Sequence, residues 1–276
     1  MSKFFLFFVG LLLLSCKQTA DESPSQVPLN SLDLVWSDEF DGSGLPDSTK
    51  WSFVVGNGCP ELCGWGNNEL EYYGDGELKN TRLENGHLVI EAHNEQKGGM
   101  DYTSGKLITK NKGDWKYGRF EFRAKLPSGV GTWPAIWMLP SDESLYGGWP
   151  KCGELDIMEH VGYEPDSIYG TIHTEAYNHI IGTQKGGAIE VKSAESEFHE
   201  YAIDWNEDRI QWLVDNKKYF EFKNETKTYK EWPFDQSFYL ILNIAVGGGW
   251  GGRQGVHEDI WPQRMEVDYV RVYQEQ

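Results

Sequence analysis

The sequence is poor in cysteine, in basic residues and in long apolar runs. Four of its 276 residues are cysteine, too few for a fold that depends on many disulfides. Lysine and arginine total 25 against 43 acids, which gives a formal charge of -18. This charge argues against nucleic acid and anionic lipid surfaces as partners, because both would repel the chain. It argues more weakly against strongly acidic polysaccharides, so a neutral ligand fits best.

The apolar run at the N-terminus is too short for a comfortable membrane span. It covers residues 4–14, follows a lysine and ends in LLSC, residues 13–16, which resembles the lipobox of bacterial lipoproteins. That resemblance implies that residues 1–15 are a signal peptide and that Cys16 becomes the lipidated first residue. An ordinary secretory signal or an uncut anchor is the alternative. We expect an exported lipoprotein, facing the periplasm or the cell surface, whose contact with the membrane is the lipid anchor alone.

The residues after the signal divide into a tether and one body. Residues 16–30 are polar and lack apolar periodicity, which is typical of a flexible tether. Residues 31–276 contain no second linker and no repeat, so we expect a single folded domain. Residues 31–276 contain three cysteines, so at least one thiol stays unpaired whether or not Cys59 pairs with Cys63. A zinc site at this pair would need two more ligands, and none lies close by. The third, Cys152, alternates with the acids that follow it and is expected near them.

Helical signals are sparse, and short alternating runs recur instead. HLVIEAH (87–93) and GRFEFRAKL (118–126) alternate apolar and polar residues, and the second should point its charged residues outward. RIQWLVDNKKYFEF (209–222) is typical of two strands around a turn, and FYLILNIAV (238–246) of a buried central strand. Together with 31 glycines and 39 aromatics, these runs predict an all-β sandwich of two sheets.

The run GTWPAIWMLP predicts a platform for sugars. On a strand, Trp133, Ala135 and Trp137 share one face, while Ile136 and Met138 share the other. Two indoles separated by a small residue suit the C–H faces of pyranose rings. Two core aromatics are the alternative interpretation.

The run GELDIMEHVG contains three acids whose spacing is irregular for a strand. Glu154 and Asp156 obey the two-residue period, but Glu159 comes one residue late. A β-bulge near Met158 would bring Glu159 to the same face. Crowded carboxyls on a sugar-binding face indicate glycoside cleavage, and close neighbours on one strand favour the retaining geometry of about 5–5.5 Å. Crowding also predicts that at least one carboxyl keeps its proton towards neutral pH.

Residues 31–276 resemble glycoside hydrolase family 16, and most closely its bacterial laminarinases, which are endo-β-1,3-glucanases. The resemblance rests on a combination of motifs: SDEFDG, GWGNNELEYY, YGRFEFRAKLP, WPAIWMLP, GELDIMEH and NIAVGGGWGG. It implies a β-jelly-roll sandwich of two antiparallel sheets with a concave substrate cleft. It also implies that Glu154 is the nucleophile, Glu159 the acid/base and Asp156 the residue that assists the nucleophile. The E-x-D-x-x-E spacing is the bulged form of the family motif.

The resemblance also supplies candidate binding residues. Trp133 and Trp137 would line subsites, and Asn68 and His173 match positions that border the cleft in such enzymes. Trp250 lies in a glycine-rich loop with little local core to join, so we expect it to form a wall of the cleft. For Asn68 a turn position, and for His173 a structural histidine, are the alternatives.

No cofactor is expected for catalysis, but many family members bind a structural calcium away from the cleft. Glu39, Gly86 and Asp268 match the segments involved, and oxygen ligands suit calcium. Solvated acids near the two chain ends are the alternative.

The lead hypothesis is a monomeric, retaining endo-β-1,3-glucanase that acts on a neutral β-glucan. A mixed-linkage β-1,3-1,4-glucanase and an algal galactan hydrolase share the fold and the acids. A non-catalytic glucan-binding lipoprotein would keep the aromatic platform without needing the acids, and a purely structural lipoprotein would need neither.

Overall fold

The structure is a computed structural model that describes Met1 and residues 32–275. The rest of the predicted signal peptide, the tether and Cys16 lie outside the described residues. Leu32–Gln276 cluster as one compact unit. Within residues 32–275, no helix is both long and apolar enough to cross a membrane.

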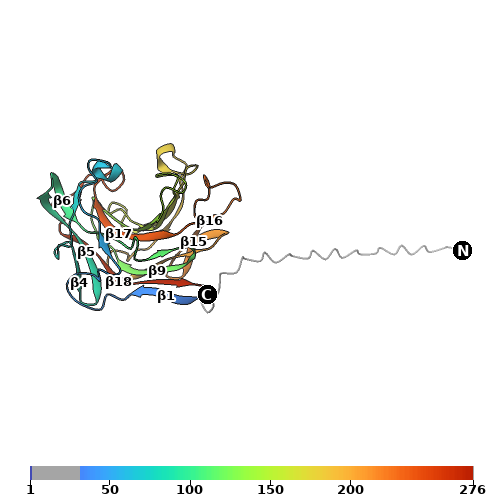
Figure 1. Cartoon of the computed structure of the whole chain (residues 1–276), viewed down its shortest axis with the longest axis horizontal. Helices are drawn as coiled ribbons and strands as arrows, with labels where there is room; N and C mark the ends of the chain where they lie inside the picture. The colour runs from blue at the N-terminus through green and yellow to red at the C-terminus, as the bar shows by residue number, and fades with distance from the viewer. Residues whose placement is uncertain (2–31, 276) are drawn as a thin grey trace. The chain divides into compact units, whose positions relative to one another are not determined.

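Two β-sheets make up this unit, and Figure 1 shows β17 of one sheet lying above β9 and β18 of the other. The ten-stranded sheet has, in spatial order, β16 (Lys217–Lys223), β15 (Arg209–Val214), β14 (His199–Trp205), β9 (Gly118–Lys125), β18 (Gln263–Gln274), β5 (His87–Lys97), β6 (Met100–Ser104) and β3 (Glu71–Tyr73), with β1 (Asp33–Asp38) on β18 and β4 (Thr81–Glu84) on β5.

The eight-stranded sheet carries most of the predicted motifs. Its spatial order is β13 (Lys185–Glu190), β12 (Ser167–His173), β11 (Glu154–Glu159), β10 (Thr132–Pro140), β17 (Phe238–Val246), β7 (Lys106–Ile108) and β2 (Ser52–Phe53), with β8 (Asp114–Trp115) on β17. Two short 3₁₀ turns, η2 (Cys63–Gly66) and η3 (His179–Ile181), interrupt the loops. The pairings are antiparallel except for β3 with β6, so the predicted antiparallel sandwich is confirmed for the described residues.

The core lies between the two sheets and follows the alternation of the sequence. Phe120, Phe122 and Ala124 of β9 are fully buried in it. All nine residues of β17 are buried, which confirms the prediction of a central strand. Each apolar side chain removed from water stabilises the fold by about 1.5–3 kcal/mol, so this double-faced strand anchors the sheet that carries the acids.

The hairpin of β15 and β16 forms where the sequence predicts it. Asp215 and Asn216 connect the strands with φ of 48° and 62°. Positive φ at both central residues matches the twist of a tight hairpin, and Asp and Asn tolerate that conformation better than most residues.

The three cysteines of the described residues form one disulfide and leave one free thiol, as their odd number requires. Cys59 and Cys63 form a disulfide, which settles the pairing that the sequence left open. Cys152 is a free thiol, fully buried next to the start of β11, and burial raises its pKa to about 12. It is a packed side chain.

Candidate active site

A bulge in β11 resolves the irregular spacing of the acids. On the β10 side, Trp137 pairs with Asp156 and Ile136 with Met158, so Ile157 is an extra residue. On the β12 side the register also shifts between Asp156 and Glu159. Both Ile157 and Met158 lie in the hydrophobic core. The side chain of the extra residue therefore packs in the core, and the predicted bulge near Met158 is confirmed.

The bulge places all three acids on one face of the sheet. Glu154, Asp156 and Glu159 pair with His173, Thr171 and Tyr169 of β12, respectively. Those partners follow one another at two-residue intervals and therefore share a face. The acids opposite them share that face too, because directly paired residues of an antiparallel ladder lie on the same side.

The two tryptophans of β10 lie on this face beside the acids. Trp133 donates its indole N–H to Glu159 Oε1 at 3.1 Å, and Trp137 donates to Asn243 Oδ1 at 2.7 Å. Both indoles are half-buried, whereas Ile136 and Met138 are fully buried in the core. The aliphatic and aromatic sides of β10 are therefore divided as the sequence predicts.

His173 lies against the two acids nearest to it. Its Nε2 is 3.6 Å from Glu154 Oε1 and 3.4 Å from Asp156 Oδ2. Among the described residues, these three are the group of His, Cys, Asp and Glu side chains compact enough to hold a metal ion, with ligand atoms within 4.8 Å of one another. Asp156 Oδ2 is buried without a hydrogen-bond donor, so ionisation of this carboxyl has a large free-energy cost of desolvation.

Burial raises the pKa of each acid to about 8. Repulsion from Asp156 adds to the upward shift at Glu154 and at Glu159, while His173 opposes it at both. Repulsion from Glu159 also contributes to the raised pKa of Glu154. The cluster therefore holds protons at neutral pH that isolated carboxyls would have lost, as its crowding predicts.

The predicted binding residues lie in two places. Trp250 packs edge-on against two rings, with centroids 5.6 Å from Trp133 and 5.1 Å from Tyr169. It therefore lies beside the acid-bearing face, close to Glu159. Asn68 has a φ of 57° and lines a shallow pocket with the glycine-rich segment 247–249. Within residues 32–275, no recorded hydrogen bond links the Asn68 side chain to the three acids.

Sequence reasoning missed further residues of this face. Trp149 has its ring 6.0 Å from His173 and 5.1 Å from His179 of η3. Lys106 and the acids Glu69 and Glu71 are buried beside Trp137 and near Gly248. Glu69 and Glu71 lie within the GWGNNELEYY motif, but Lys106 lies outside every motif of the sequence, because only long-range strand pairing brings it to the site.

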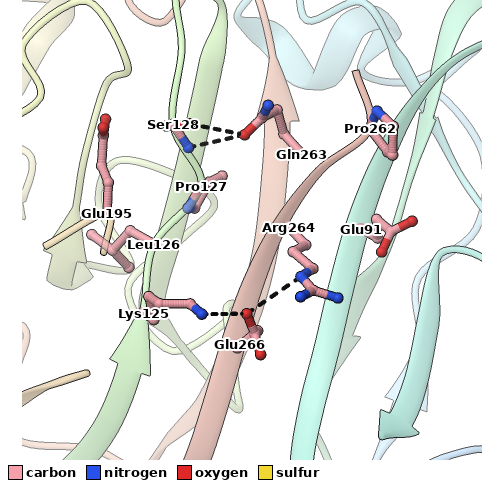
Figure 2. Close-up of a pocket in the computed structure, with 10 residues that line it drawn as sticks. All are labelled: Glu91, Lys125, Leu126, Pro127, Ser128, Glu195, Pro262, Gln263, Arg264 and Glu266. Atoms are coloured by element: carbon pink, nitrogen blue, oxygen red, sulfur yellow. Dashed lines mark hydrogen bonds and ion pairs between the residues drawn. The ribbon is translucent and has the colours of Figure 1, made fainter. Parts of the chain in front are cut away.

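A pocket on the ten-stranded sheet differs in chemistry from this face (Figure 2). Three of its charged side chains are paired with one another: Glu266 Oε1 lies 2.6 Å from Lys125 and 3.3 Å from Arg264. Ser128 donates to Gln263, and no aromatic ring lines the pocket. Nothing there resembles the acid cluster.

The calcium candidates lie on and beside strands of the ten-stranded sheet. Glu39 follows β1, Gly86 lies in the β4–β5 turn, and Asp268 is on β18. The Glu39 carboxylate accepts two hydrogen bonds from Arg271. Asp268 Oδ2 accepts one from Arg123, while its Oδ1 lies 3.6 Å from His87.

Comparisons with known proteins agree with this geometry. The family model for glycosyl hydrolases family 16 matches residues 65–271. A beta-glucanase of Rhodothermus marinus is 52% identical over 96% of this chain and 93% of its own length. The X-ray structure of the laminarinase from Rhodothermus marinus has a TM-score of 0.85 at 53% identity, covering 88% of this chain and 97% of that one. A non-specific endo-beta-1,3(4)-glucanase has a TM-score of 0.84 at 49% identity, covering 89% and 92%.

Proposed function

This chain belongs to glycoside hydrolase family 16, and from that premise we propose that it cleaves internal β-1,3-glucosidic bonds of laminarin-type glucans with retention of configuration. The observation that carries the proposal is the bulge of β11, which gathers Glu154, Asp156 and Glu159 on one face. A regular strand would have turned Glu159 into the core.

The roles follow from the chemistry of two carboxyls flanking one bond. A Glu154 oxygen attacks the anomeric carbon while the glycosidic bond breaks and Glu159 gives its proton to the departing oxygen. Water then attacks the same carbon, loses its proton to Glu159 and releases Glu154. Both steps balance with side chains and water alone, so catalysis needs no cofactor.

The surroundings of the acids support this division of labour. Asp156 lies between the two glutamates along β11, and burial together with its repulsion raises the pKa of both, which keeps a proton available on Glu159. His173 faces Glu154 and Asp156, the side where negative charge is needed for attack. The Trp133 N–H steadies the carboxylate that Glu159 becomes after it gives up its proton.

The glucan would bind along the indoles of Trp133, Trp137 and Trp250, with Asn68 at the border of the glycine-rich loop. Half-buried indoles on the face of the acids offer the flat apolar surface that sugar rings need. A mixed-linkage β-1,3-1,4-glucanase is the second candidate, because a relative with 49% identity is described as acting on β-1,3(4)-glucan.

Product analysis on laminarin, lichenan, agar and carrageenan, run side by side, tests the substrate. We expect short oligosaccharides from laminarin first; rapid cleavage of agar or carrageenan with laminarin untouched would overturn the proposal. NMR of the first product should show the β anomer. A non-catalytic binding protein would release nothing from any of the four.

A structural calcium is proposed at Glu39, Gly86 and Asp268. Asp268 Oδ1 would supply a carboxylate ligand, since its recorded neighbour among the described residues is His87 at 3.6 Å, and main-chain carbonyls would supply the rest. The Glu39 carboxylate is held by Arg271, so Glu39 would offer its carbonyl. Thermal melting with calcium and with a chelator tests this. A chelator-induced drop that Asp268→Asn abolishes supports the site, and identical melting curves contradict it.

The lipid anchor, the export and the monomeric state are proposed from the sequence alone. Mass spectrometry of the N-terminal peptide should show a lipidated Cys16, and Cys16→Ala should move the protein from the membrane to the soluble fraction. An unmodified Cys16 would contradict the anchor. Light scattering of residues 31–276 should give the mass of one chain.

A further inference from the structure

Lys106 lies on the same face of the sheet as the acids, yet the mechanism above does not use it. It pairs with Asn243 of β17, which pairs with Ala135 of β10, which pairs with Glu159. This continuous row of directly paired residues places Lys106 on the acid-bearing face, toward β7.

Aromatic rings surround the ammonium of Lys106. Its Nζ lies 4.5 Å from the ring centroid of Trp65, 5.0 Å from that of Trp137 and 5.4 Å from that of Tyr73. The residue is 8% exposed. Ring faces attract a cation, but they do not accept its hydrogen bonds as oxygen atoms do.

The ammonium of Lys106 makes no hydrogen bond to an oxygen atom of the described residues. Within residues 32–275, no hydrogen bond or ion pair to its Nζ is recorded, although an ammonium offers three donors. Arg119, the other buried lysine or arginine among the described residues, has such a partner in Glu121. A nearly buried ammonium without an acceptor indicates that something else supplies the oxygen.

Two buried carboxyls complete the environment. Glu69 and Glu71 are 7% and 0% exposed, and Glu71 Oε1 has no hydrogen-bond partner. Burial raises the pKa of both and lowers that of Lys106, while the attraction of Glu69, Glu71 and Glu154 favours the charged ammonium. The carboxyls thus favour a charged ammonium at this position, and an ammonium can donate hydrogen bonds to sugar hydroxyls.

We propose that Lys106 is a substrate-binding residue whose ammonium donates hydrogen bonds to the hydroxyls of a glucose unit bound beside Trp137 and Trp65. The inference rests on the proposed function, because it takes a β-glucan as the ligand. The indoles pack on the sugar ring and the ammonium fixes its hydroxyls, so Lys106 selects for the orientation of that unit.

Binding to a catalytically inactive protein isolates this contact from the chemistry. In the Glu154→Gln background, the affinity for laminarihexaose is measured by calorimetry with Lys106 intact and with Lys106→Met, Lys106→Gln and Lys106→Arg. Lys110→Met is the matched control, because Lys110 also lies over a ring, Tyr239 at 5.0 Å, but has a carboxylate partner in Glu143. Melting temperatures of all variants show whether each is folded.

We expect Lys106→Met to weaken binding at least tenfold, which is about 1.4 kcal/mol. Lys106→Arg should recover part of the loss and Lys110→Met should change nothing. The melting temperature of Lys106→Met should hold or rise, because the variant removes a buried charge. Should Lys106→Met fail to fold, the affinity of Lys106→Gln is compared with that of the intact background instead.

Binding within twofold of the intact background in both neutral variants would overturn the proposal. So would a fall in melting temperature with affinity unchanged, which is the signature of a structural role. Failure of the wild-type chain to hydrolyse laminarin would contradict the proposed function instead. In that case, retained binding of the oligosaccharide with loss in Lys106→Met would still support the contact.

Discussion

On the ten-stranded sheet, buried acids lie against an arginine, whereas on the eight-stranded sheet three acids lie against one another and a histidine. Arg119, 3% exposed, donates to Glu121, to Glu200 and to Asp204 on the outer face of its sheet. No arginine or lysine is recorded as an ion-pair partner of the three β11 acids within residues 32–275.

This contrast distinguishes charged groups that stabilise the fold from charged groups that take part in catalysis. A buried acid paired with arginine keeps its charge and its hydrogen bonds, so removing the partner is costly. A buried acid among other acids is held at a raised pKa, which destabilises the fold when the group ionises but leaves it available for proton transfer. Each region predicts a different response to substitution.

The largest effect is expected from Glu154→Gln. The variant removes the attacking oxygen, so kcat on laminarin should fall on the order of 10³-fold or more. Initial-rate assays measure the loss. Glu190→Gln, an exposed acid on β13, is the control and should keep wild-type activity; a similar loss there would show that any removed charge is harmful.

Arg119→Met should lower stability and leave activity nearly unchanged, which is the opposite of the result expected for Glu154→Gln. It leaves Glu121 buried without its partner, so we expect about 3 kcal/mol of lost stability with near-normal activity at low temperature. Urea denaturation gives the loss. Arg123→Met removes a more exposed arginine and should cost less than about 1 kcal/mol; equal losses would contradict the contrast.

The stability of the wild type should fall as pH rises from about 4.5 to about 8. Burial raises the pKa of Glu154 from its ordinary 4.5 to about 8 in the folded state, so the fold binds more protons than the unfolded chain in that window. Glu154→Gln should therefore melt higher than wild type at pH 8, by on the order of 10 °C, and little differently near pH 4. Calorimetry at both values checks this; a lower melting temperature at pH 8 would contradict it.

The smallest effect is expected from Trp133→Phe. It keeps an aromatic ring but removes the N–H that donates to Glu159, a bond that lowers the pKa of that carboxyl. The alkaline limb of the kcat/KM profile should move up by roughly half a pH unit, since Glu159 must be protonated to act. Trp137→Phe, whose N–H reaches Asn243 instead, should leave that limb in place.

The sequence predicted what local rules control. The two-residue period of β10 and the extra residue in β11 were enough to place the tryptophans and the bulge. Asp215 and Asn216 were enough to predict the hairpin. Such features depend on neighbours along the chain, which a sequence displays directly.

Features that depend on distant pairing were missed or misjudged. Arg119 and Glu121 were expected to point outward, and they do lie opposite the core residues, but they are buried because β14 and the β15–β16 turn supply partners. Lys106 was overlooked because β7 reaches the acids only across β17 and β10. Its environment is assembled from segments far apart in the chain.

The assignment of the two glutamates is tested most directly by rescue with azide. In Glu154→Ala, azide should restore turnover of an activated glucoside and give the α-glucosyl azide, because it attacks from the face that Glu154 occupied. In Glu159→Ala, azide should intercept the covalent intermediate and give the β-azide. The reverse pattern of products, or an α-azide from both variants, would contradict the account.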